Sequence, residues 1–219
     1  MSQVKTKSYL SKTVENLKPS GIRRFFDLAA GMEGVISLGV GEPDFVTSWP
    51  VREAAILSLE QGYTSYTANA GLLELREEIS RYMKERFQLD YAAENEIIVT
   101  VGASEAIDIA LRAIIDPGDE VIVVEPCFVS YEALVELAGG AAVTVSATKE
   151  NDFKVRAADL EQAVTEKTKA ILICSPNNPT GTMLSRQDLE EIAAIAKEHD
   201  LLIIADEIYA ELSYDEEFT

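Results

Sequence analysis

Short apolar runs and amphipathic segments alternate along the chain from about residue 96 onward. Runs rich in β-branched residues predict five strands, at residues 97–100, 121–124, 142–145, 170–173 and 201–204. Apolar positions at helical spacing predict helices between them, at residues 105–115, 129–137, 158–164 and 188–198. The strands are almost continuously apolar, a pattern typical of a parallel sheet that helices cover on both faces. The sequence therefore predicts an α/β protein with three layers, α/β/α, around a mainly parallel sheet.

Turn and cap residues agree with these boundaries. Asp-Pro-Gly-Asp at residues 116–119 predicts a turn before a strand, and Gly139-Gly140 predicts the end of a helix. Ser185 and Asp188 have the spacing of a capping box.

The first hundred residues are less regular. We expect an extended arm at residues 1–20, a short helix at 22–30 and a strand at 35–38. Further helices are predicted at residues 50–62, capped by Thr47 or Ser48, and at residues 72–87. The second of these collects an apolar stripe, made of Leu72, Leu75, Ile79, Tyr82 and Met83.

Composition excludes several classes of function. The 219 residues include 38 acidic and 19 basic side chains, a formal net charge of −19, which repels phosphodiester backbones and anionic membrane surfaces. We therefore expect no nucleic-acid partner and no membrane partner. Two cysteines, Cys127 and Cys174, make no disulfide framework, and no Cys/His cluster has metal-ligand spacing. A polar N-terminus without a long apolar run predicts a cytoplasmic protein, and we expect no bound metal.

In an open α/β sheet, ligands bind beyond the carboxyl ends of the strands, so the residues that follow each strand are candidates for a site. Val-Gly-Ala-Ser-Glu-Ala at residues 101–106 opens a helix with small residues, and its N–H groups with the Ser104 hydroxyl suit a phosphate. A plain strand-to-helix turn is an equal alternative. Phe128 is able to lie over a planar ring, although core packing is the simpler interpretation.

The last two predicted strands end in more unusual residues. Cys-Ser-Pro-Asn-Asn-Pro-Thr-Gly at residues 174–181 predicts a rigid loop in which an asparagine aims a hydrogen bond at a ligand. Asp206 ends an apolar strand, where a carboxylate is costly unless a cation or a strong donor meets it. Tyr209 is placed to reach the same ligand. The alternative role for Asp206 is that of a helix cap.

Together these residues resemble the N-terminal part of the class I and II aminotransferases, which are pyridoxal-phosphate enzymes of fold type I. The matching segments follow the order of the family and cover almost the whole chain. They are Gly-Val-Gly-Glu-Pro-Asp-Phe at 39–45, Tyr66, Ala-Gly-Leu-Leu-Glu-Leu-Arg at 70–76, and the segments 101–106, 116–119, 175–181 and 206–209. Each segment alone is weak, but their joint occurrence is specific.

The resemblance implies pyridoxal 5′-phosphate as the cofactor and a homodimer as the assembly. Ala103 and Ser104 would hold the cofactor phosphate, and Tyr66 would reach the phosphate of the partner subunit. Gly41 would offer its backbone to the substrate carboxylate.

The resemblance also assigns contacts to the cofactor ring. Phe128 would stack on the pyridine, and Asp206 would pair with the protonated ring nitrogen. Asn178 and Tyr209 would hydrogen-bond the phenolic oxygen. In the family the bonds that match Glu125-Pro126 and Asn178-Pro179 are commonly cis.

One part of the family pattern has no match. The family's Schiff-base lysine lies beyond the Asp-x-x-Tyr motif, and no lysine of this sequence corresponds to it; Lys169 and Lys197 are more simply interpreted as solvent-facing. The arginine that clamps the substrate carboxylate is also unmatched. We therefore expect a fragment without a catalytic residue of its own, inactive alone. By resemblance, residues 1–45 are an N-terminal arm and small-domain segment, and residues 46–219 are the N-terminal part of a cofactor-binding large domain, incomplete at its C-terminus.

The function expected of the whole protein is transfer of an amino group from an amino acid to a 2-oxo acid. Alternatives are another fold-type-I enzyme, such as a lyase, decarboxylase or synthase, and a noncatalytic cofactor-binding fragment. A nicotinamide dehydrogenase is disfavoured because no Gly-x-Gly-x-x-Gly follows a strand. Aspartate, aromatic, alanine and N-acetyl-diaminopimelate aminotransferases all resemble this stretch, so the amino acid stays open.

Overall fold

The computed structural model describes residues 9–17, 32, 34, 36, 41, 45–214 and 218. The chain divides into two compact units, one of residues 1–18 with 101–219 and the other of residues 19–100. The predicted helix at 22–30 and most of the predicted strand at 35–38 lie outside the described residues. The predicted domain division after residue 45 stays a prediction.

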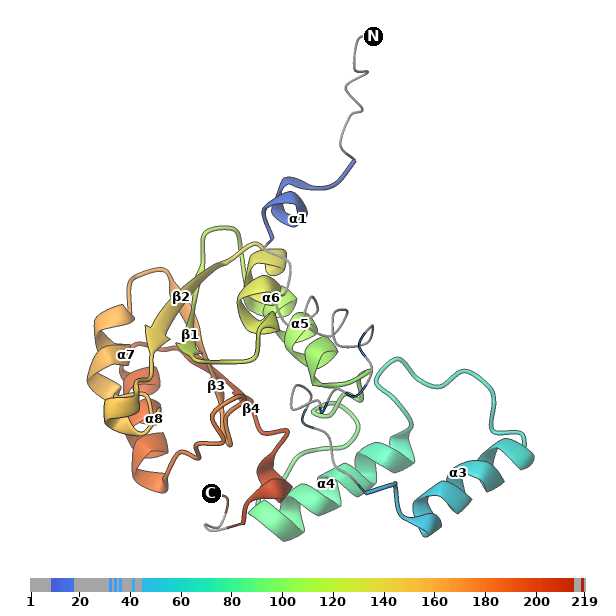
Figure 1. Ribbon diagram of the computed structural model, residues 1–219. Coiled ribbons are helices and arrows are strands. Elements are labelled where there is room, and N and C mark those ends of the chain that lie inside the picture. The colour runs from blue at the N-terminus through green and yellow to red at the C-terminus, as the bar shows by residue number, and fades with distance from the viewer. Residues whose placement is uncertain are drawn as a thin grey trace. The chain divides into compact units, whose positions relative to one another are not determined.

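A parallel sheet forms the centre of the first unit (Figure 1). Its strands are β1 (Glu120–Glu125), β2 (Ala141–Ser146), β3 (Thr168–Cys174) and β4 (Leu202–Asp206). They lie in the order β2-β1-β3-β4, and all neighbours are parallel. The register places Cys174, at the end of β3, beside Asp206, at the end of β4. The segments that follow these two strands therefore start side by side.

Helices cover both faces of this sheet (Figure 1). The helical elements of the first unit are α1 (Lys12–Asn16), α5 (Ala103–Ile114), α6 (Ser130–Ala138), α7 (Ala157–Ala163) and α8 (Arg186–Glu198), with the 3₁₀ turns η1 (Lys149–Asn151) and η2 (Ala210–Leu212). α5 and α6 lie on one face, and α7 and α8 lie on the other. The four helices predicted between the strands begin and end within about two residues of α5, α6, α7 and α8. α1 was not predicted, since it lies in the segment expected to be an extended arm.

The core consists of two clusters that the sheet separates. Val121 and Val123 of β1 pack with Leu111 of α5 in one cluster, and Ile122 packs with Leu160 of α7 in the other. These side chains are completely buried, because successive residues of a strand point to opposite faces. Burial of each contributes about 1.5–3 kcal/mol. The alternation confirms the predicted three-layer α/β/α architecture.

The predicted turn and caps are also present. The Asp116 N–H donates to Asp119 Oδ2 (2.9 Å), and this bond holds the pKa of Asp119 below its usual value. Gly139 ends α6 with φ of 97°, a left-handed conformation that glycine adopts without strain. Ser185 and Asp188 form the reciprocal capping box of α8. Local sequence signals were therefore sufficient at these joints.

The second unit contains two long helices, α3 (Trp49–Glu60) and α4 (Leu73–Phe87). α3 begins after Ser48, one of the two predicted caps, but no side-chain hydrogen bond caps it. The predicted stripe on α4 is mostly uncovered, since Leu72 and Leu75 are exposed. Arg76 is the buried residue of α4, and its Nη1 donates to the Ala93 carbonyl (2.7 Å).

The prediction of a strand at residues 97–100 was wrong, since these described residues form no strand. The Val99 N–H donates to the Ala70 carbonyl (3.0 Å), which ties this segment to a loop. No strand pairs with it among the residues that the structure describes. Because a strand needs a neighbour for its N–H and C=O groups, a β-branched run alone is not sufficient.

Candidate cofactor-binding site

A pocket of about 160 Å³ lies at the carboxyl ends of β3 and β4, next to the start of α5. It is lined by Val101, Gly102, Ala103, Ser104, Ile107, Phe128, Tyr131, Cys174, Asn178, Asp206, Ile208 and Tyr209. Six of the residues that the sequence predicted as cofactor ligands are in this set. The other two candidates, Tyr66 and Gly41, belong to the second unit, where the Tyr66 side chain is fully exposed.

One side of the pocket is the start of α5. Gly102, the N-cap, has φ of 83°, which a residue with a side chain adopts only with strain. No side chain caps the helix, while Ala103 and Ser104 form its first turn. The Glu105 carboxylate turns back to accept the Val101 N–H. The positive end of the helix dipole and the first-turn N–H groups make this side suitable for an anion.

Another side of the pocket carries Asp206, the last residue of β4. Its Oδ2 accepts a hydrogen bond from Tyr131 Oη (2.6 Å), and its Oδ1 accepts one from the Ile208 N–H (3.2 Å). The next helical turn, η2, has Tyr209 as its N-cap. Asp206 is therefore not placed as a helix cap. The strong donor that the sequence led us to expect beside this carboxylate is Tyr131.

Tyr131 is a residue that the sequence reasoning missed. Its side chain is 1% exposed, and its ring meets Phe128 edge-to-face, with 5.7 Å between centroids and 76° between planes. Burial and the bond to Asp206 raise the pKa of Tyr131 far above its usual value, so the phenol remains a proton donor. The sequence feature that could have indicated Tyr131 is its position on the apolar face of a predicted helix, three residues after Phe128.

The loop after β3 supplies the amide of Asn178. Its Nδ2 lies 3.4 Å from Tyr209 Oη, so both groups approach the pocket from adjacent strands. Cys174, also in the lining, donates its thiol to the Pro176 carbonyl (3.3 Å), and burial raises its pKa. Nearby, burial and the Glu125 carboxylate raise the pKa of Cys127 to about 11. Both thiols are therefore protonated near neutral pH.

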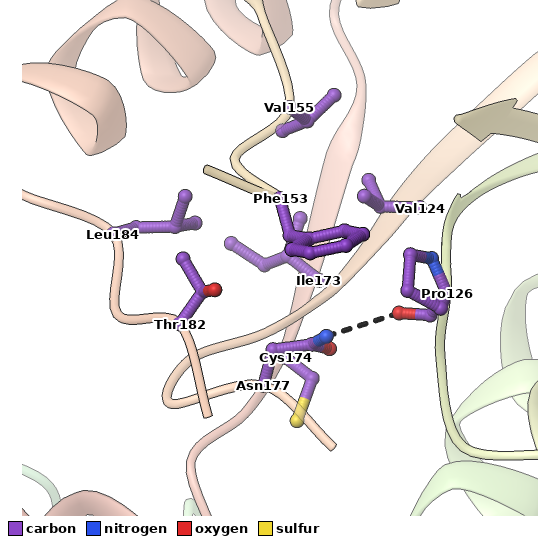
Figure 2. Close-up of a pocket in the computed structure, with 9 residues that line it drawn as sticks. All are labelled: Val124, Pro126, Phe153, Val155, Ile173, Cys174, Asn177, Thr182 and Leu184. Atoms are coloured by element: carbon purple, nitrogen blue, oxygen red, sulfur yellow. Dashed lines mark hydrogen bonds between the residues drawn. The ribbon is translucent and has the colours of Figure 1, made fainter. Parts of the chain in front are cut away.

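Asn177, the neighbour of Asn178, holds the loop. Its Nδ2 donates to the Pro126 carbonyl (3.0 Å) and to Thr180 Oγ1 (2.8 Å). Figure 2 shows the first of these bonds, which joins the loop after β3 to the segment after β1. The predicted cis bonds at Glu125-Pro126 and Asn178-Pro179 are present, and Ser175-Pro176 is also cis.

Figure 2 also shows that these segments surround a second cavity, lined largely by apolar side chains. This cavity holds about 20 Å³, which is room for about one water molecule. It is too small for an organic cofactor. The pocket beside α5 is the candidate site because six of the predicted ligands line it.

Two lysines and the histidine lie away from this pocket. Lys169 and Lys197 are exposed, as predicted, and Lys169 pairs with Asp119 at 3.5 Å. His199 ends α8, and its Nε2 lies 2.7 Å from Glu161 Oε1. Within the described residues, no group of three His, Cys, Asp or Glu side chains is arranged to hold a metal ion. No helix in the described parts of the chain has the length and apolar character of a membrane span.

Comparison with known proteins identifies the family of this arrangement. The model of the family "Aminotransferase class I and II" matches residues 33–219. The protein "Putative aminotransferase YugH" of Bacillus subtilis (strain 168) is 71% identical over 97% of this chain and 55% of its own length. An aspartate aminotransferase of Pyrococcus abyssi (strain GE5 / Orsay) is 47% identical over 94% of this chain and 53% of its own.

Solved structures give the same result. The aspartate aminotransferase from Thermus thermophilus with maleate superimposes with a TM-score of 0.90 at 40% identity. The match covers 96% of this chain and 56% of that structure. The chain therefore spans about half the length of the relatives it matches.

Proposed function

The chain belongs to the class I and II aminotransferase family, and from this premise we propose that the whole protein transfers an amino group from an amino acid to a 2-oxo acid, with pyridoxal 5′-phosphate as cofactor. The proposal rests on the lining of one pocket. The start of α5, the Phe128 ring and the Asp206 carboxylate lie there, together with the Asn178 amide beside the Tyr209 phenol. These groups match the phosphate, pyridine ring, ring nitrogen and phenolic oxygen of the cofactor. The relatives named as aminotransferases support the same reaction.

The start of α5 binds the phosphate in this proposal. The backbone N–H groups around Ala103 and Ser104, with the Ser104 hydroxyl, supply donors to the phosphate oxygens. Gly102 leaves space, since among the described residues no atom beyond its chain neighbours lies within 4 Å of the position that a Cβ would take there. Phosphate binding fixes one end of the cofactor and thereby orients its ring.

Asp206 and Phe128 hold the ring. When bound, pyridoxal 5′-phosphate supplies an electron sink for the carbanion that forms as the substrate loses its α-proton. The Asp206 carboxylate retains the proton on the ring nitrogen by charge pairing. Phe128 covers one face of the ring and excludes water from it.

Asn178 and Tyr209 would bind the phenolic oxygen of the ring. The amide N–H and the phenol O–H are both donors, and they lie together at the pocket. Donation from two groups stabilises negative charge on the phenolic oxygen. The pair therefore orients the cofactor and holds its charge distribution.

The remaining parts of the proposal concern the whole protein. Its substrates are small amino acids and 2-oxo acids, and it works as a cytoplasmic homodimer in amino-acid metabolism. Tyr66 binds the phosphate in the partner subunit, and the Gly41 backbone binds the substrate carboxylate. The exposure of Tyr66 supports the role in a partner's site.

The test of the proposal is Asp206→Asn in the whole protein. Because a neutral amide does not retain the proton on the ring nitrogen, we expect the fold to persist while the half-reaction with an amino acid slows ~100-fold or more. Half-reaction rates from absorbance and melting temperatures measure the two effects.

The matched control is Asp206→Glu, which keeps the charge at a displaced position and is expected to retain more activity. A fully active Asp206→Asn enzyme would remove the central residue of the proposal. Failure of the whole protein to bind pyridoxal 5′-phosphate would overturn the proposed function itself.

A further inference from the structure

Tyr131 is the most deeply buried polar side chain that lines the pocket. It lies at the second position of α6, is 1% exposed, and reaches across the sheet edge to Asp206, 75 residues later in the chain. A buried hydroxyl needs a hydrogen-bond partner, and here the partner is a carboxylate oxygen at 2.6 Å. The position of the phenol and that of the carboxylate are therefore coupled.

The bond fixes how Asp206 faces the pocket. Oδ2 accepts the Tyr131 hydroxyl, and Oδ1 accepts the Ile208 N–H at 3.2 Å. A carboxylate has about four acceptor positions, so both oxygens keep capacity for a further donor. Tyr131 does not lose its proton near neutral pH, because burial and this bond raise its pKa. It therefore acts as a donor to the carboxylate.

The same side chain also supports Phe128. The two rings meet edge-to-face at 5.7 Å between centroids, a geometry that fixes the Phe128 plane. Asp206 and Phe128 come from strands that are not neighbours, since β3 lies between β1 and β4. Tyr131 thus links two pocket groups that the backbone alone does not hold together.

We propose that Tyr131 is a positioning residue for the cofactor ring: its hydroxyl orients Asp206 and stabilises its charge, and its ring edge orients Phe128. The inference rests on the proposed function. Its chemical consequence concerns the proton between Asp206 and the ring nitrogen. A donor to the carboxylate favours the charged form of the acid, so Tyr131 keeps this proton on the nitrogen.

The experiment replaces the hydroxyl alone, with Tyr131→Phe in the whole protein loaded with cofactor labelled with ¹⁵N in the ring. We expect the ¹⁵N signal to move from the pyridinium position toward that of neutral pyridine, because Asp206 without its donor holds the shared proton better. We expect kcat to fall ~10-fold, the effect of one charge-assisted hydrogen bond, with KM for the amino acid little changed. Tyr91→Phe removes an exposed hydroxyl outside the pocket and is the matched control.

The outcomes separate the inference from the proposed function. An unchanged ¹⁵N signal in Tyr131→Phe, even with a lowered melting temperature, overturns the positioning role and leaves only a structural one. If Tyr131→Phe fails to fold, Tyr131→His is the second variant, because histidine retains a hydrogen-bond donor. A ¹⁵N signal at the pyridinium position in Tyr131→His supports the positioning role, and a signal at the neutral pyridine position overturns it. Absence of cofactor binding by the unmodified protein overturns the proposed function, and this inference with it.

Discussion

At the scale of single residues, two adjacent asparagines of one loop have different partners. Asn177 makes two short hydrogen bonds inside the protein, to the Pro126 carbonyl and to Thr180 Oγ1. Asn178 has one long contact, to Tyr209, and lines the pocket. The first residue therefore stabilises the loop, and the second is available to a ligand.

This division predicts opposite effects of the same truncation. Asn177→Ala leaves the Pro126 carbonyl without its donor, so we expect a loss of about 1–3 kcal/mol in the free energy of unfolding. Asn178→Ala is the matched control, with a change within about 0.5 kcal/mol but weaker cofactor binding. Thermal unfolding of the cofactor-free protein and titration with pyridoxal 5′-phosphate measure the two quantities. A larger stability loss in Asn178→Ala than in Asn177→Ala would contradict this assignment.

The same residues show what a sequence indicates about a site. Asp206 and Phe128 could be predicted because each follows a strand, and the ends of parallel strands meet at one edge. Tyr131 and Asn177 were missed because their roles depend on partners 75 and 51 residues away. No local pattern distinguishes a buried tyrosine that packs from one that also donates.

At the scale of elements, the sequence correctly predicted the strands of the sheet from their apolar runs and the helices from their local cap residues. The strands β1 and β3 are apolar and mainly buried, and β4 is apolar although Leu202 and Ile203 are exposed; α8 has its capping box. Prediction failed at residues 97–100, which have strand-like composition but no neighbouring strand among the described residues. A strand needs a neighbouring strand to satisfy its N–H and C=O groups, whereas a helix and its caps satisfy most of theirs within one segment.

The α8 capping box predicts a pH-dependent contribution to stability. Burial opposes the charge of Asp188, but hydrogen bonds from Ser185 and Lys154 outweigh it and hold the pKa of Asp188 below its usual value. A lowered pKa gives stability that is present above the unfolded-state pKa and lost as pH falls through the folded-state pKa. We therefore expect Asp188→Asn to lower the melting temperature at pH 7, with the difference beginning to shrink below about pH 4, near the unfolded-state pKa, and vanishing below the folded-state pKa.

Two further variants complete this test. Ser185→Ala removes the other half of the box and should cost about 1 kcal/mol. Glu190→Gln removes an exposed charge from the same helix without a capping contact and should have almost no effect. A pH-independent difference for Asp188→Asn would show that its charge does not stabilise the cap.

At the scale of the whole molecule, the described part of the second unit has many exposed apolar side chains. α3 has no buried residue and α4 has only Arg76, although both carry large apolar side chains. Exposed ones include Trp49, Val51, Ile56, Leu57, Leu59, Leu72, Leu75 and Tyr82. Apolar surface of this kind is typical of interaction surfaces, which supports the proposed homodimer.

The proposed dimer predicts that two defective variants restore each other. If Tyr66 binds the phosphate in the partner subunit, Tyr66→Ala weakens cofactor binding at both sites of its homodimer, and Asp206→Asn slows both sites of its own. In a mixed dimer, the subunit with Tyr66→Ala keeps its own Asp206 and receives Tyr66 from its partner, so one site is intact. Unfolding and refolding an equal mixture should then restore about a quarter of the normal activity, since half of the dimers are mixed. Sedimentation checks the dimer, and a mixture no more active than its separate components would show that Tyr66 serves its own subunit or no site at all.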